Sequence, residues 1–211
     1  MTQLGLFPLR LVAFPGERLP LHIFEPRYRE LIAECLASGE EFGILLADDD
    51  GIRAVGTRVA IVELLEKLPD GRVNIVVEGR ERFRLAELSE GRSFNTGVVE
   101  PFVDDDDPAG AAAAADAAAE ALRLLQALAD AADVDVELPR PDSPTLSFEV
   151  AARVELELGD EQELLELRSE RRRLARVIEL LGEAVERTRF EREVHERAKT
   201  NGKLPHPPSH P

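Results

Sequence analysis

The chain has a single cysteine, no tryptophan and only three lysines among its 26 basic residues. A lone cysteine, Cys35, excludes an internal disulfide and any metal site built from several cysteines. The scarcity of lysine leaves few candidates for lysine-based catalysis. No apolar run approaches the roughly 20 residues that span a bilayer, and residues 1–10 lack the basic and apolar regions of a signal peptide. We therefore expect a cytoplasmic protein with no membrane contact.

Positive charge is also scarce. The 42 acidic residues outnumber the basic ones and give a formal net charge of -16. Non-specific binding to nucleic acid depends on Lys and Arg side chains that neutralise phosphates. We therefore expect no nucleic-acid partner. A chain of 211 residues is long enough to bury a real hydrophobic core.

The first half, residues 1–103, has the patterns of a β-rich subdomain. In residues 73–85, polar residues at even positions alternate with apolar residues at odd ones, which predicts an antiparallel sheet with one solvated face. Pro69, Asp70 and Gly71 predict a hairpin turn, and Gly79 predicts a bulge or a barrel corner. Several such strands favour a small, partly closed barrel. The apolar or alternating runs are LFPLRLVAF, RLPLHIF, EFGILLA, TRVAIVELLEKL, RVNIVVEGRERFRLAEL and TGVVEPF.

The stretch LPLHIFEPRYRELI, residues 19–32, admits two interpretations. His22 and Glu25 could form a catalytic pair. Alternatively, a strand ending at Phe24 enters a helix at about residues 26–38, with Pro26 in the first helical position and Gly39 as a left-handed cap. We favour the structural interpretation, because strand-to-helix entry accounts for the stretch without chemistry.

The second half, residues 104–198, predicts a helical subdomain. An acidic turn precedes an alanine-rich helix that ends near Ala132. We expect Ser143 to cap a second helix, and Asp160 with Glu163 to form an approximate capping box on a third. A long last helix begins near Ser169; its first part carries an apolar stripe, whereas its end exposes only two apolar side chains, Phe190 and Val194. Residues 199–211 are proline-rich and expected to be disordered.

Three parts of the chain resemble a known family. The residues LFPLRLVAFPGERLPLHIFEPRYRELI, the later VGTRVAIVELLEKLPDGRVNIVVEGRERFRL and the helical LSFEVAARVELELGDEQELLEL are similar to the N-terminal, substrate-recognition domain of ATP-dependent Lon proteases. That domain also occurs in stand-alone bacterial proteins. The resemblance covers about residues 4–185. It implies an α+β fold, with a PUA-like β-barrel subdomain followed by an α-helical bundle that ends in a long helix.

The chain departs from the protease in the residues that carry catalysis. The single Gly-Lys pair, Gly202-Lys203, is followed by Leu204 and lacks the Ser or Thr of a phosphate-binding loop. We find no space for an ATPase domain or a domain with a Ser–Lys dyad. We therefore expect no catalytic residues, no metal, no cofactor and no enzymatic activity of the Lon type.

The resemblance implies a non-catalytic polypeptide-binding module that takes unfolded or tagged polypeptide. It could act as an adaptor in protein quality control, together with a separate protease or chaperone. Rings are the natural anchors of an apolar binding groove, although most rings in a protein are core. The candidate contact residues are Phe14, Phe24, Tyr28, Phe42, Phe190 and Val194.

Two other functions remain as alternatives. A PUA-like fold could bind RNA or a nucleotide through Arg80, Arg82 and Arg84, although acidic residues interleave with them. An unrecognised enzyme could use His22 with Glu25, or Cys35 as a nucleophile. Cys35, however, lies on the apolar face of the predicted helix, where a thiol usually packs as a small hydrophobe.

Overall fold

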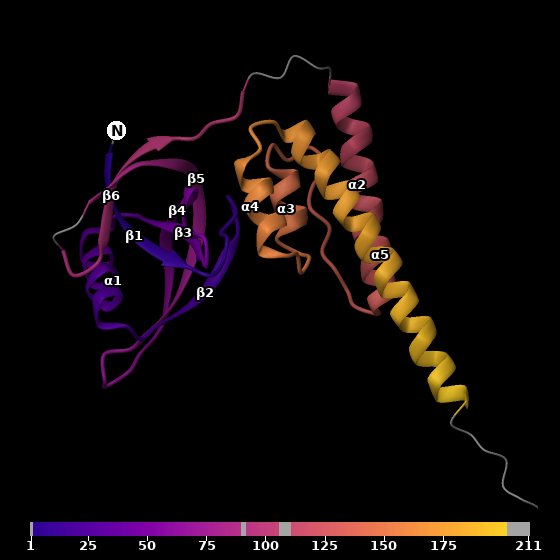
Figure 1. Cartoon of the computed structure of the whole chain (residues 1–211), viewed down its shortest axis with the longest axis horizontal. Helices are drawn as coiled ribbons and strands as arrows, with labels where there is room; N and C mark the ends of the chain where they lie inside the picture. Colours follow the sequence, from indigo (N-terminus) through magenta and orange to yellow (C-terminus); the bar gives the residue numbers. More distant parts are fainter. Residues whose placement is uncertain (1, 90–91, 106–110, 202–211) are drawn as a thin grey trace, which may run out of the picture.

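The computed structural model describes residues 2–89, 92–105 and 111–201. A sheet with one helix across it forms one side of the molecule, and four helices form the other (Figure 1). The strands are β1 (Thr2–Leu9), β2 (Arg18–Ile23), β3 (Phe42–Asp48), β4 (Gly51–Lys67), β5 (Val73–Ser89) and β6 (Asn95–Pro101). The helices are α1 (Pro26–Ser38), α2 (Ala111–Ala132), α3 (Leu146–Ala151), α4 (Leu158–Glu166) and α5 (Glu170–Asn201).

The six strands form one mixed sheet in the order β2-β5-β4-β3-β1-β6. A further pairing joins β6 to β5, so the strand pairings run around a ring of five strands, with β2 attached outside it. β1 and β3 are parallel, and the other pairs are antiparallel. The α+β class, with a sheet followed by helices, is as expected from the sequence, whereas the parallel pair β1–β3 is not.

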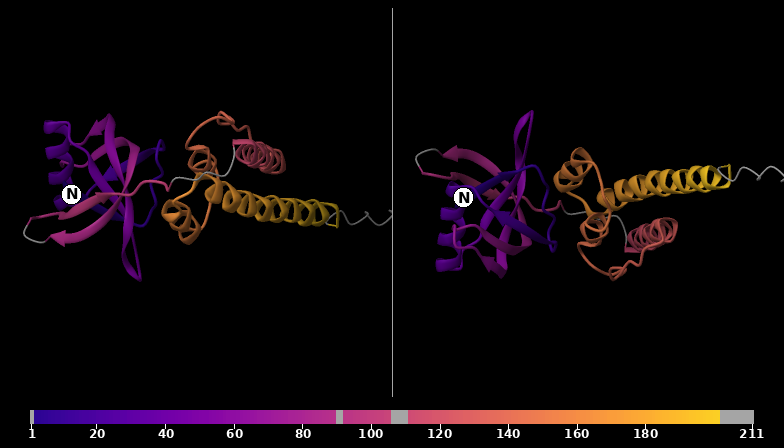
Figure 2. Two further views of the ribbon diagram at one scale, coloured as in Figure 1. Left: turned by 90° about the horizontal axis from the view of Figure 1, so that it is seen from above. Right: turned by 90° about the horizontal axis from the view of Figure 1, so that it is seen from below.

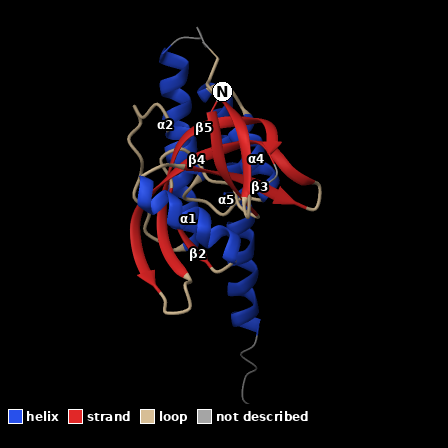
Figure 3. Ribbon diagram, turned by 90° about the vertical axis from the view of Figure 1, so that its left-hand side faces the viewer, coloured by secondary structure: helices blue, strands red, loops and turns tan. Residues whose placement is uncertain are grey.

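α1 covers one side of the sheet (Figure 3). Pro26 occupies the start of the helix, and Gly39 ends it in the left-handed conformation with φ 75°. Both termini follow the expected residue chemistry. The apolar face of α1 packs on strand residues to form the sheet core. Its main members are Phe7, Ile23, Tyr28, Leu31, Ile32, Cys35, Phe42, Ile44, Val59, Ile75 and Val77.

The β4–β5 hairpin turns where the sequence predicts. The Gly71 N–H donates to the Leu68 carbonyl at 3.0 Å, and Gly71 has a φ of 86°. In β5 the odd positions from Val73 to Val77 are buried, which confirms the alternation there. The expectation of a solvated even face is wrong at Arg82, which is buried.

The helices pack on the sheet through a second core. Phe14, at the turn after β1, stacks on Phe148 of α3 with ring centroids 5.4 Å apart. This core has members from both halves of the chain: Val12, Phe14, Leu46, Val55 and Phe102 from the first, and chiefly Ala121, Leu125, Leu146, Val150, Leu164, Leu165, Leu174, Val177 and Leu181 from the second. α3 and α4 lie between the sheet and the two long helices (Figure 2).

Two expected helix caps are wrong. The residue that caps α3 is Thr145 rather than Ser143, and it makes no side-chain cap hydrogen bond. Asp160 and Glu163 do not form a capping box on α4; both accept hydrogen bonds from Arg176 of α5, at 2.7 and 3.0 Å. Arg176 therefore ties α4 to α5. A third carboxylate, that of Glu179 on α5 itself, accepts a hydrogen bond from Arg176 at 3.3 Å.

α5 changes character along its length. Its first half is buried on α2 and α3 through residues such as Leu174, Val177, Leu181 and Val185. Its second half extends beyond the other helices (Figure 1). From Gly202 on, the tail that is expected to be disordered lies outside the described part of the chain. None of the described helices is both long and apolar enough to cross a membrane.

Candidate functional site

A three-strand extension of the sheet carries most of its exposed apolar side chains. Pairing of β4 with β3 ends at Val59, whereas pairing of β4 with β5 continues to Lys67. We call β2, residues 60–67 of β4 and residues 73–78 of β5 the sheet arm. β2 and β4 are about 10 Å apart there, since each lies one strand spacing from β5. The exposed apolar residues on or at the end of the arm are Phe24 (60% exposed), Val62, Leu64 and Leu65.

A row of polar side chains crosses the arm beside Phe24. His22 Nδ1 lies 2.6 Å from the Asn74 side-chain oxygen, and the Asn74 amide donates to Glu66 at 3.0 Å. The Phe24 ring stacks on His22 with centroids 6.0 Å apart. Glu25 instead accepts a hydrogen bond from Arg27 at 3.0 Å. His22 and Glu25 are therefore each held by another partner, and the arrangement is structural rather than an acid–base pair.

The six predicted contact residues divide into two groups. Phe14, Tyr28 and Phe42 are buried in the two cores, at most 3% exposed. These three rings are therefore removed from the expected contact surface, because a buried ring cannot touch a partner while the core is intact. Phe24, Phe190 and Val194 are exposed. The sheet arm holds the first, and the far end of α5 holds the other two.

Cys35 has the environment of a core residue. Burial, together with the charges of Glu40 and Glu34, raises the pKa of its thiol to about 11. Since the thiolate is the nucleophile, a thiol with this pKa is inert near neutrality. The part of the chain that the structure describes also brings together no three His, Cys, Asp or Glu side chains that could hold a metal.

Local sequence patterns do not reveal an ionic cluster between the sheet and the helices, in which two buried arginines share one carboxylate, of Asp104, that is 36% exposed. Asp104, which follows β6, binds Arg173 of α5 through both carboxylate oxygens, at 2.8 and 2.6 Å. It also pairs with Arg82 of β5. The side chains of Arg82 and Arg173 are 6% and 2% exposed. We call these three residues the seam cluster.

Other donors of the seam cluster bind backbone carbonyls at the end of α4 and just after it. Arg82 donates to the Leu165 and Leu167 carbonyls at 2.7 and 2.8 Å, and Arg173 donates to Leu167 at 2.8 Å. Both guanidinium groups also lie over the Phe148 ring. The cluster therefore joins β5, the segment after β6 and α5 at one point, and fixes how the helices sit on the sheet.

The basic patch expected from Arg80, Arg82 and Arg84 is not formed. Arg80 pairs with Glu78 at 2.5 Å, Arg82 is buried, and Arg84 lies over the Phe102 ring. The three arginines thus have protein partners and do not present a common cationic face. This geometry gives no support to RNA or nucleotide binding through them.

Two carboxyl groups meet where α4 approaches the turn before β2. Burial and, to a smaller extent, the charge of Glu17 together raise the pKa of Glu161 to about 7. Burial also raises the pKa of Glu17, although a hydrogen bond from the Phe14 N–H at 2.9 Å opposes the rise. This contact between sheet and helices is therefore weakened when both groups are ionised.

Replacing Glu161 with glutamine is expected to stabilise the protein at pH 8 by about 1 kcal/mol, a value reduced for the solvent that reaches this half-buried side chain. The pKa of Glu161 is raised in the fold above its ordinary value of 4.5. Its unfavourable contribution is therefore absent below that value and grows as the pH rises toward about 7. Urea unfolding at pH 5 and pH 8 measures the difference. The prediction is contradicted if Glu161→Gln changes the free energy of unfolding equally at both pH values. It is also contradicted if Glu183→Gln, the control at an exposed site, has an equal effect.

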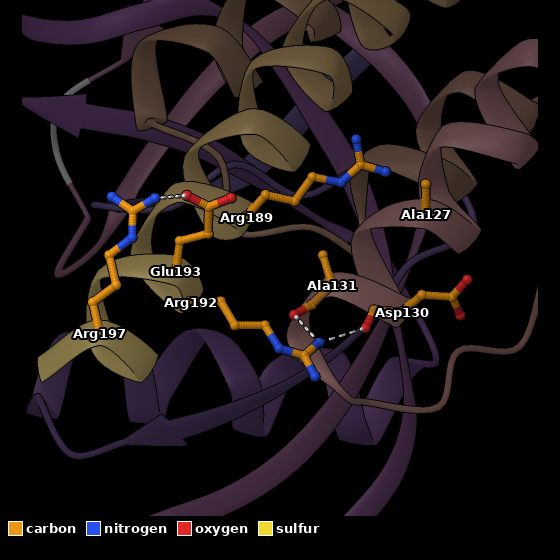
Figure 4. Close-up of a pocket in the computed structure, with 7 residues that line it drawn as sticks. All are labelled: Ala127, Asp130, Ala131, Arg189, Arg192, Glu193 and Arg197. Carbon is orange, nitrogen blue, oxygen red and sulfur yellow. Dashed lines mark hydrogen bonds and ion pairs between the residues drawn. The ribbon is translucent and has the colours of Figure 1, made fainter. Parts of the chain in front are cut away.

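A second open surface is a groove of about 770 Å³ between α2 and the far end of α5 (Figure 4). Its α2 side is formed by Ala127, Asp130 and Ala131, and its α5 side by Arg189, Arg192, Glu193 and Arg197. Arg192 points to the end of α2 and donates to the Asp130 and Ala131 carbonyls at 3.4 and 3.3 Å. We call this surface the α2–α5 groove.

Comparison with known proteins identifies the family. The family described as "ATP-dependent protease La (LON) substrate-binding domain" matches residues 3–183. The Lon protease of Trichlorobacter lovleyi is 29% identical in an alignment of 200 positions, which covers 84% of this chain and 23% of that protein. Lon protease 1 of Bacillus subtilis is 26% identical over 93% of this chain and 27% of its own length. The chain thus spans about a quarter of the curated relatives it matches.

Solved structures show the same fold. A Lon N-terminal domain protein from Xanthomonas campestris superposes with a TM-score of 0.60 at 28% identity, over 84% of this chain and 98% of that one. The N-terminal domain of Lon protease from the Mycobacterium avium complex gives a TM-score of 0.69 at 17% identity, over 86% and 98%. The second likeness concerns the fold alone.

Proposed function

Because the chain belongs to the LON substrate-binding domain family, we propose that it is a non-catalytic module that binds polypeptide, with the sheet arm as its contact surface. The observation that carries the location is the number of exposed apolar side chains on this short segment, on both of its faces: Leu64 is opposite Ile75, whereas Phe24 stacks on His22, which is opposite Asn74. Phe24, Leu64 and Leu65 are each about half exposed or more. Exposed apolar groups that gather in one place mark interaction sites more often than single ones do.

The physical basis of binding is the removal of these side chains from water. An apolar side chain that becomes fully buried contributes about 1.5–3 kcal/mol. Two half-exposed residues thus account for a useful part of a micromolar affinity, which corresponds to about 8 kcal/mol. Unfolded polypeptide supplies the matching apolar groups, whereas a folded protein keeps them in its core. Delivery of the bound polypeptide to a separate protease or chaperone would extend this role to that of an adaptor in protein quality control.

The double variant Phe24→Ser with Leu64→Ser is expected to bind unfolded polypeptide about tenfold more weakly than the wild-type chain. The probe is fluorescently labelled lactalbumin, reduced and carboxymethylated so that it stays unfolded, and the readout is anisotropy. Leu138→Ser removes a comparably exposed leucine in the α2–α3 connection and serves as the control. Unchanged affinity in the double variant, or an equal loss in the control, would show that the sheet arm is not the site.

A further inference from the structure

We infer that the α2–α5 groove is a docking surface for an acidic amphipathic helix of a partner protein. This inference goes beyond polypeptide binding by the sheet arm and concerns a different surface. Three guanidinium groups, of Arg189, Arg192 and Arg197, stand in the groove beside two carboxylates, Asp130 and Glu193. That local excess of positive charge contrasts with the net charge of -16 of the whole chain.

The guanidinium groups have weak partners within the chain. Arg189 lies 3.5 Å from Glu186, and Arg197 lies 3.3 Å from Glu193. All four side chains are more than half exposed, and exposed pairs of this kind contribute little. Arg192 donates to two backbone carbonyls at 3.4 and 3.3 Å, which are long hydrogen bonds. Carboxylates of a partner could therefore bind all three arginines at little cost.

The shape of the groove suits a helix. Its α2 side presents Ala127 and Ala131, whose small side chains let a third helix approach closely. The α5 side runs from Arg189 to Arg197, a rise of about 12 Å, or roughly two helical turns. A partner helix with acidic residues at intervals of three or four would place a carboxylate at each arginine.

Apolar anchors lie at the rim of the groove. Phe190 is 67% exposed, and Val194, one turn further along, is 48% exposed. Glu193 and Arg197 follow Phe190 by three and seven residues, so they lie on the same side of α5. The surface thus combines apolar and cationic groups, which is the complement of a helix with one apolar and one acidic face. Nucleic acid fits less well, because a phosphate backbone offers no apolar partner to the exposed Phe190 and Val194.

The test uses the full chain and two labelled peptides of about five helical turns. Both carry the same leucines on one face; one carries glutamates on the flanking positions, and the other carries lysines. We expect the acidic peptide to bind with an affinity that falls as salt rises, and the basic peptide to bind at least about tenfold more weakly. Fluorescence anisotropy measures both, and circular dichroism confirms that each variant keeps its helices.

Two variants locate the site. The double variant Arg189→Glu with Arg197→Glu and the neutral variant Phe190→Ser are each expected to weaken binding of the acidic peptide about tenfold. Arg172→Glu, an exposed substitution near the start of the same helix, is expected to leave it unchanged. Arg189→Gln with Arg197→Gln replaces the double variant if the latter loses helicity.

Several results would overturn the inference. These are equal binding of both peptides, full affinity in the arginine and Phe190→Ser variants, or tighter binding of a single-stranded RNA than of the acidic peptide. Self-association through the groove, seen by sedimentation as a dimer that Phe190→Ser dissociates, would assign the surface to a second copy instead. The sheet-arm variant Phe24→Ser with Leu64→Ser retains peptide binding if the two surfaces are separate, so failure of either proposal is distinguishable.

Discussion

Replacing Asp104 with alanine is expected to lower the free energy of unfolding by about 3–5 kcal/mol. The substitution removes the one carboxylate that pairs with both Arg82 and Arg173, whose side chains are almost fully buried. Burial already lowers the pKa of Arg82, and the nearby charge of Arg173 lowers it further, while Asp104 opposes both effects. Without Asp104 the buried Arg82 would lose its carboxylate partner, and Arg173 would keep only Glu170, at 2.8 Å, to balance two neighbouring positive charges. Chemical denaturation monitored by circular dichroism measures the loss.

Asp105→Ala is the matched control for this prediction. Asp105 is the next residue and pairs with Arg168, but both side chains of that pair are well exposed. We expect its loss to change stability by less than about 1 kcal/mol. Equal effects of the two substitutions would contradict the importance assigned to the seam cluster.

The same cluster gives a pH dependence of definite sign. Burial would raise the pKa of Asp104, but the hydrogen bonds and charges of Arg173 and Arg82 outweigh burial and lower it. A carboxyl whose pKa is lowered in the fold stabilises the protein above its ordinary pKa, 3.8 for aspartate, and loses that contribution as the pH falls further. The difference between wild type and Asp104→Ala should therefore shrink in acid.

The second large effect is expected for Gly79→Ala, at about 3 kcal/mol of lost stability. A Cβ at this position would lie 2.0 Å from the Phe14 carbonyl oxygen, so backbone must move. The backbone of Gly79 also binds Gly16 and Glu17, each at 2.9 Å. The displaced turn carries Phe14, which stacks on Phe148 of the helices. The substitution thus strains the sheet and its contact with the helices at once.

Gly182→Ala provides the comparison. Gly182 lies inside α5, and a Cβ there meets nothing within 4 Å. Alanine should therefore stabilise this helix by up to about 1 kcal/mol. Thermal unfolding of both variants separates the two cases. If Gly79→Ala were neutral, the close approach of the residue 14–17 turn to β5 would not be a constraint on the fold.

Local patterns in the sequence were enough to predict much of the sheet and α1. The LPDGR turn, the helix start at Pro26 and the cap at Gly39 depend on the backbone preferences of single residues, and the structure has all three. The alternation from Val73 to Val77 depends on strand geometry, and it too is present. These features are local, so they can be read without knowledge of the tertiary fold.

Features that depend on distant residues could not be predicted in this way. Arg82 continues a series of polar residues that the sequence places on a solvated face. It is buried because it pairs with Asp104 and lies near Arg173, which is 91 positions further along the chain. The supposed capping box of Asp160 and Glu163 fails for the same reason, because Arg176 of α5 binds both carboxylates. In each case a tertiary ion pair replaces the local role that the sequence suggests.

The candidate contact residues show the same division. The sequence identifies which side chains are aromatic but not which of them the helices and α1 cover. Phe14, Tyr28 and Phe42 are covered, whereas Phe24 lies just beyond the end of β2 and remains in solvent. The exposed leucines of β4 were not among the candidates, because the strand reads as an ordinary apolar run until its pairing with β3 is seen to end at Val59.

Amide hydrogen exchange of the full chain, with and without an excess of the unfolded lactalbumin probe, measures whether the sheet arm binds polypeptide. Backbone amides of the sheet arm are measured against those of the buried first half of α5 as an internal reference. We expect slower exchange in β2 and in residues 60–67 of β4 when the probe is bound, and no change in the reference. Binding of the probe without protection of either strand would contradict the claim that the sheet arm is the polypeptide-binding surface.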